Sequence, residues 1–187
     1  MNVVRNPAVT GLLWLLARLW LGYEWLHAGI EKVIGEGAVK WVGAEAGGSV
    51  AGFLKGAIAK SSLAEGFDPA KTPHPAVSEW YATLARDVFI PNAQLMSYLV
   101  AYGELLVGIA LIVGIFTRFS ALMGAVMALA FLLAGTTSSG LPILLMVGLA
   151  ITLSGTTAGV YGLDYFAKPI EQKLLRRVTG AATPQVA

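Results

Sequence analysis

Four stretches of the chain are apolar over lengths near the roughly 20 residues that a helix needs to cross a hydrocarbon core about 30 Å thick. They fall at residues 8–30, 92–116, 118–136 and 141–159. The second and third stretches are so close in sequence that they predict a tight antiparallel hairpin. A short polar segment, Thr-Thr-Ser-Ser-Gly, separates the third from the fourth. The pattern predicts an all-α fold, an integral membrane four-helix bundle.

Residues 31–91 interrupt this apolar pattern after the first span and form one long polar connection, called the cap below. Two of its segments place apolar side chains at helical spacing, which predicts short amphipathic helices on the membrane surface or across the end of the bundle. The apolar positions are Phe53, Leu54, Ala57 and Ile58 in the first segment, and Trp80, Leu84 and Val88 in the second. Three prolines in residues 67–75 exclude a continuous helix between them.

The composition agrees with a membrane protein. Apolar residues make up 56% and charged residues 13% of 187 residues, whereas a soluble domain has roughly 25% charged residues. A net charge of +2 gives no basic footprint for nucleic acid. The chain has no cysteine, which excludes disulfides, thiolate metal ligands and iron–sulfur clusters held by this chain. The length predicts a single domain, residues 1–187.

Basic residues orient the predicted spans. They occur before the first span, in the hairpin and in residues 160–187, which an even number of spans places on one side. Cytoplasmic loops carry the excess of Lys and Arg, so both termini are expected to be cytoplasmic and the cap to lie outside. The first apolar run is longer than the core of a signal peptide, about 7–15 residues, and is expected to remain as a helix. A further amphipathic helix is predicted in the tail.

Two charged residues fall near the middle of predicted spans, Arg18 in the first and Glu104 in the second. Each is costly in lipid without a partner. Because the two helices are consecutive and antiparallel, a direct Arg18–Glu104 ion pair is predicted. Such a pair either fixes only the register of the helices or also shapes a site.

Glu24 and His27 lie three residues apart on one face of the first span. A carboxylate and an imidazole at this spacing can accept and relay protons, or both can extend toward the membrane interface.

A second stripe of the first span carries small, aromatic and cationic residues: Arg18, Gly22, Trp25, Gly29 and Lys32. The two glycines predict a slot with the tryptophan as its wall, which suits a quinone ring or a neighbouring helix. Tyr98, in the second span, belongs either to the same pocket or to an aromatic belt at the interface.

The residues that carry these features resemble the DoxX/DoxD family of membrane proteins. The resemblance lies in residues 18–32, in residues 103–124 and in residues 158–166, which contain Asp164. The cap, with His74-Pro75 and Trp80-Tyr81, is closer to the DoxD branch, which includes the small subunit of thiosulfate:quinone oxidoreductase. One departure is Leu141-Pro142, where the family pattern leads us to expect Asn-Pro.

The resemblance implies a multi-pass protein of a bacterial or archaeal cytoplasmic membrane that works with quinone and with partner subunits or as a homo-oligomer. Glu24, His27 and Glu104 are then the candidate catalytic residues, and Arg18, Trp25, Lys32 and Tyr98 the candidate quinone-binding or anion-binding residues. No metal site is predicted, and only two histidines are present, which argues against a haem with two histidine ligands. The alternatives are an accessory subunit of a respiratory or photosynthetic complex and, third, a small transporter, although no inverted repeat supports the latter.

Overall fold

The computed structural model describes residues 7–154, 158–159 and 161–165. Their regular elements are all helices, so the predicted all-α class is confirmed for the described residues. The predicted apolar stretches correspond to four long helices, of which the last ends several residues earlier than expected. These are α1 Pro7–Val33, α5 Ala93–Val113, α6 Thr117–Leu133 and α7 Gly140–Leu153.

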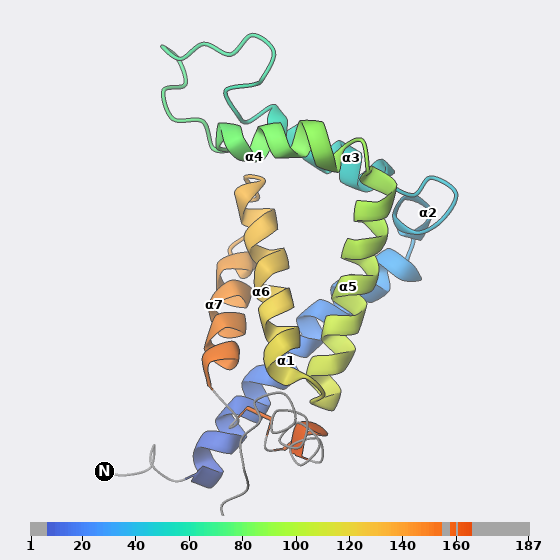
Figure 1. Cartoon of the computed structure of the whole chain (residues 1–187), viewed down its shortest axis with the longest axis vertical. Helices are drawn as coiled ribbons and strands as arrows, with labels where there is room; N and C mark the ends of the chain where they lie inside the picture. The colour runs from blue at the N-terminus through green and yellow to red at the C-terminus, as the bar shows by residue number, and fades with distance from the viewer. Residues whose placement is uncertain (1–6, 155–157, 160, 166–187) are drawn as a thin grey trace, which may run out of the picture.

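The long helices pack mainly as two pairs, α1 with α5 and α6 with α7 (Figure 1). Glycines allow the first pair to approach closely: a Cβ added to Gly29 would lie 2.5 Å from the backbone nitrogen of Leu105, and one added to Gly22 would lie 2.9 Å from Ile112. Small residues at such positions are typical of helix packing in membranes. The slot predicted between Gly22 and Gly29 is therefore filled by α5, which is the neighbouring-helix alternative rather than a quinone pocket.

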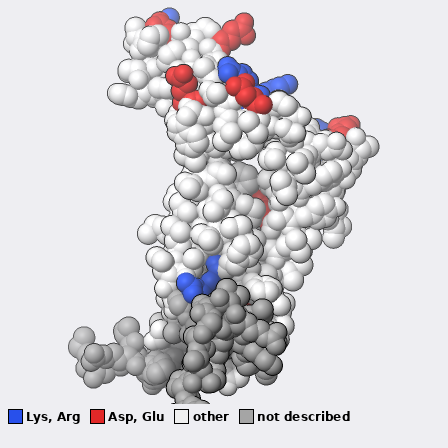
Figure 2. Space-filling model, viewed as in Figure 1, with Lys and Arg blue, Asp and Glu red and all other residues white. Residues whose placement is uncertain are grey.

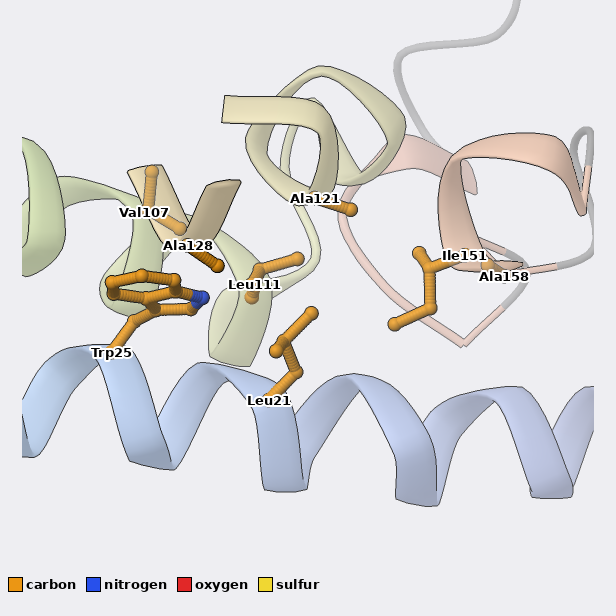
Figure 3. Close-up of a cluster of buried hydrophobic side chains, with 8 residues drawn as sticks. All are labelled: Leu21, Trp25, Val107, Leu111, Ala121, Ala128, Ile151 and Ala158. Atoms are coloured by element: carbon orange, nitrogen blue, oxygen red, sulfur yellow. The ribbon is translucent and has the colours of Figure 1, made fainter. Parts of the chain in front are cut away.

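Trp25 joins the two helix pairs in the core (Figure 3). Its side chain is buried, and its indole nitrogen would lie 2.6 Å from a Cβ added to Gly124 of α6. Apolar side chains from all four long helices, and Ala158 beyond α7, complete this cluster: Leu21, Val107, Leu111, Ala121, Ala128, Ile151 and Ala158. Trp25 thus packs as a core residue against α5 and α6.

In the view of Figure 2 the surface of the long helices is mostly uncharged, apart from a basic patch toward the end remote from the cap and a few acidic atoms midway, whereas charged side chains gather over the cap. By length and composition α5 alone among the described helices qualifies as a membrane span, and α6 and α7 are apolar but shorter. Many large side chains on these helices are apolar and exposed, among them Leu106, Phe119 and Met146. Such a surface is unusual for a soluble monomer.

The cap contains four short helices, and α3 and α4 lie across the end of the bundle (Figure 1). They are α2 Ala38–Trp41, α3 Gly48–Ile58, α4 Glu79–Leu84 and the π-helical turn η2 Ala85–Phe89. In α3, Leu54 and Ala57 are buried, as the spacing predicts, whereas Phe53 is partly exposed and contacts the ring of Phe131 edge-on.

The apolar stripe of α4 is not the face that packs on the bundle. Trp80 is 59% exposed, and the buried residues are Tyr81, Ala82 and Ala85. The reason is a specific contact with the bundle, because the hydroxyl of Tyr81 donates a hydrogen bond of 2.9 Å to the carbonyl oxygen of Ala130 in α6. The helix is therefore rotated by one residue relative to the apolar spacing. The amphipathic helix expected in the tail lies outside the described residues.

Candidate functional site

A buried ion pair joins the last turn of α1 to α5. Lys32 Nζ lies 2.7 Å from Glu104 Oε2, and the side chains are 19% and 2% exposed, respectively. The ammonium also donates a 3.3 Å hydrogen bond to the carbonyl oxygen of Ala28 and lies 5.1 Å from the centre of the Trp41 ring. Glu104 Oε2 has no further hydrogen-bond partner in the described part of the chain. The site therefore combines a cation donor, a carboxylate acceptor and a flat aromatic surface.

The short helix α2 is fastened beside this pair by Ser97 of α5. The buried hydroxyl of Ser97 donates a 2.6 Å hydrogen bond to the carbonyl oxygen of Trp41. This contact keeps the Trp41 ring near Lys32, where the ring can attract the ammonium through its π-electrons. Ser97 and Trp41 were not among the predicted site residues, because nothing in their local pattern indicates that the cap folds back on α5.

The predicted Arg18–Glu104 pair is wrong. The contacts between α1 and α5 set Gly29 beside Leu105, so Arg18 falls beside Gly114, which directly follows the last residue of α5. Ten residues of α5 separate Gly114 from Glu104, which corresponds to about 15 Å of helix. The prediction assumed that residues near the middle of each apolar stretch lie at the same depth. This assumption fails here because α1 is longer than α5 and extends past the C-terminal end of α5.

Arg18 instead binds the segment that follows α7. Its Nη2 donates a 3.0 Å hydrogen bond to the carbonyl oxygen of Tyr161, and its side chain is 1% exposed. The guanidinium abuts the backbones of Gly114 and Gly162, positions where any side chain would collide with it. Arg18 thus connects α1, the end of α5 and residues 161–165.

Asp164 from the same segment caps α6. Its Oδ1 accepts a 2.7 Å hydrogen bond from the backbone N–H of Phe116, and its Oδ2 accepts one of 2.9 Å from Thr117. Phe116 has a left-handed backbone with φ of 49°, and a carboxylate stabilises the free N–H groups at a helix start. Arg18 and Asp164 therefore form a structural cluster at the end remote from Glu104.

Glu24 and His27 follow one stripe of α1, as predicted, but the carboxylate in contact with His27 is that of Glu31. His27 Nε2 lies 3.9 Å from Glu31 Oε1, and both side chains are more than half exposed. Glu24 is half-buried, and the described residues offer it no ion-pair partner. Glu31 was not among the predicted site residues, although its spacing of four residues from His27 was a usable signal.

Tyr98 lies on α5 between Ser97 and the ion pair. Its hydroxyl accepts a 3.3 Å hydrogen bond from the side-chain amide of Gln94, and its ring lies 6.3 Å from that of Tyr102. Six residues separate Tyr98 from Glu104, which is about 9 Å along the helix. The candidate residues brought together by the fold are therefore Lys32 and Glu104, with Arg18, Trp25, Glu24, His27 and Tyr98 placed elsewhere.

Exposed apolar side chains along the long helices and close glycine-mediated packing between helices are typical of helical membrane proteins. The family model of DoxX matches residues 13–134, and the chain therefore belongs to the DoxX family. This match begins in α1 and ends directly after α6, so α7 and the segment with Asp164 lie beyond it. No curated protein and no solved structure matches the chain.

Proposed function

We propose that the chain is a four-span membrane subunit of a quinone-linked oxidoreductase, with its site at Lys32 and Glu104 below the cap. In this arrangement α1, α5, α6 and α7 cross the bilayer, both termini are cytoplasmic and the cap is outside. The many exposed apolar side chains of α5, α6 and α7 and the gathering of charged side chains over the cap (Figure 2) support this placement in the bilayer. The observation that carries the redox proposal is the buried Lys32–Glu104 pair.

The residues at this site fit a quinone head group. The Lys32 ammonium can donate a hydrogen bond to a ring carbonyl oxygen, and the Glu104 carboxylate can hold or pass on a proton. The ring of Trp41, 5.1 Å from Lys32 Nζ, offers a flat surface for stacking. Bound quinone would supply the two-electron chemistry, because the chain has no cysteine with which to hold an iron–sulfur cluster.

The electron donor that fits the proposal is thiosulfate, an anion that Lys32 can attract to the outer mouth of the site. In the balanced reaction two thiosulfate ions each lose one electron and join through a new S–S bond to give tetrathionate. The two electrons and two protons reduce one quinone to quinol. A partner subunit can deliver the electrons in place of direct contact.

The test is thiosulfate-dependent reduction of decylubiquinone by the protein purified with its co-purifying subunits. Lys32→Met is expected to lower the rate by at least about tenfold, as expected when one charge-stabilising contact is removed. Lys55→Met on the exposed face of α3 is the matched control and should keep the wild-type rate. An inactive wild-type complex that retains all of its subunits would contradict the proposal.

A second candidate, a non-catalytic accessory subunit, is favoured by two contacts. The Gly22–Gly29 slot is filled by α5, and Lys32 and Glu104 satisfy each other's charge. On this alternative Glu104→Gln leaves the activity of the assembled complex unchanged while the chain still co-purifies at fixed stoichiometry.

A further inference from the structure

Three ionisable side chains follow one stripe of α1 at positions i, i+3 and i+7: Glu24, His27 and Glu31. His27 and Glu31 are 60% and 67% exposed, and Glu24 is half-buried. The neighbouring Tyr23 is 59% exposed, and its ring lies 5.9 Å from that of His27. This stripe, called the α1 acidic stripe below, therefore points away from the α5 contact.

The α1 acidic stripe begins near the middle of the proposed spans. Trp25 packs on Gly124, which is close to the midpoint of α6, Thr117–Leu133. Glu24 directly precedes Trp25 and shares its depth. His27 and Glu31 follow at about 4.5 and 10 Å toward the cap, given the rise of a helix.

The α1 acidic stripe has no cation to balance it within the described part of the chain. His27 and Glu31 contact each other at 3.9 Å, and Lys32, the nearest cation in sequence, is paired with Glu104. A carboxylate that faces lipid at mid-depth is strongly unfavourable unless a partner neutralises it or water reaches it. The surface is therefore incomplete as it stands.

We propose that the α1 acidic stripe docks a transmembrane helix of a different protein that carries Lys or Arg at the depth of Glu24. The proposal rests on the four-span arrangement given above but not on the redox activity. Charge complementarity selects the occupant, because an opposite charge stabilises Glu24 and its neighbours, whereas an apolar helix would leave them unpaired.

A second copy of the chain does not supply this charge. Two copies that met at this face would bring their Glu24 side chains together and add like charges. The cations of the described long helices are Arg18, Lys32 and Arg118. The first two are engaged, and Arg118, which donates to the carbonyl oxygen of Thr152, lies at the far end of α6.

The test uses Tyr23→Cys as a single labelling site, since the chain has no cysteine and Tyr23 is exposed. The labelled protein is reconstituted in phosphatidylcholine vesicles with a synthetic leucine-rich helix that has one central lysine and a fluorescent acceptor. We expect the lysine helix to bind about fivefold or more tightly than the same helix with leucine at that position, as interhelical polar contacts of this kind do. Glu24→Gln should abolish this preference, and Glu36→Gln, exposed beyond the end of α1, should leave it intact.

Equal binding of the two synthetic helices, or a lysine preference that survives Glu24→Gln, overturns the proposal. Energy transfer between differently labelled copies of the chain, without any synthetic helix, assigns the surface to a second copy instead and also overturns it. Reaction of Tyr23→Cys with a membrane-impermeant thiol reagent shows that water covers the face and contradicts the four-span arrangement. None of these measurements depends on quinone reduction, so their failure is distinct from failure of the redox proposal.

Discussion

The ammonium of Lys32 lies 2.7 Å from the carboxylate of Glu104, and this contact joins the last turn of α1 to the middle of α5. The same ammonium lies 5.1 Å from the ring of Trp41 in α2. Three elements, α1, α2 and α5, therefore meet at one cation. Because the carboxylate is nearly inaccessible and the ammonium is only partly so, the two residues should respond differently to substitution.

Lys32→Met is expected to destabilise the protein more than Glu104→Gln. The first change leaves a buried carboxylate without its counter-ion, which costs about 3–5 kcal/mol, whereas the second leaves an ammonium that can still reach water. The double variant should recover much of the loss, because no unpaired charge remains. Thermal unfolding of the four proteins in detergent measures these differences, and a double variant less stable than both single variants would contradict the assignment.

The lengths and approximate limits of the long helices could be predicted from sequence, because apolar runs are a local signal. The partner of Glu104 could not be predicted from sequence. Which residue of α1 faces it depends on the register with α5, and the register is set by close packing of Gly29 on Leu105 and Gly108 on Leu26. The sequence shows the glycines but not which turns of the two helices meet.

The glycine contacts between α1 and α5 predict a loss of stability for Gly29→Ala. A Cβ there would lie 2.5 Å from the nitrogen and 2.7 Å from the Cα of Leu105, so the helices must separate. Gly52→Ala in α3 is the matched control, since nothing lies within 4 Å of its added Cβ. That control should gain about 0.5–1 kcal/mol, as alanine does over glycine inside a helix. Opposite shifts of the two thermal midpoints would confirm the packing, and equal shifts would refute it.

Removal of the Asp164 carboxylate should loosen the start of α6. Asp164→Ala deletes both hydrogen bonds to the N–H groups of Phe116 and Thr117, and loss of a helix cap costs about 0.5–2 kcal/mol. Hydrogen exchange at these two amides should accelerate, while exchange in α3 stays unchanged. Asp68→Ala in the cap is the control, because that carboxylate binds only local partners, Ala70 and Lys71.

From sequence, Asp164 could be identified only as part of a family motif, and Arg18 was predicted to bind the wrong partner. Both belong to contacts that span more than 40 residues of chain, from Tyr161 to Arg18 and from Asp164 to Phe116. Apolar periodicity carries no information about such pairs, because it reports which side chains are buried and not which backbone atoms they reach. The same reason explains why apolar spacing does not reveal the buried face of α4, where a hydrogen bond to Ala130 accompanies the burial of Tyr81 rather than Trp80.

Tyr81 should make the attachment of the cap depend on alkaline pH. Burial raises the pKa of its hydroxyl, so on raising the pH the unfolded chain loses this proton first, near the ordinary value of about 10. The folded state then binds more protons than the unfolded state, and stability falls from about pH 10 upward until the hydroxyl of the folded protein also ionises. Tyr81→Phe removes this dependence and, by deleting the 2.9 Å hydrogen bond to Ala130, lowers stability at neutral pH by about 0.5–1.5 kcal/mol. The test is to measure the thermal midpoints of the wild type and of Tyr81→Phe between about pH 8 and 11, a range that spans the ordinary pKa of tyrosine. If the difference between the two midpoints is the same at every pH, Tyr81 is not the titrating group.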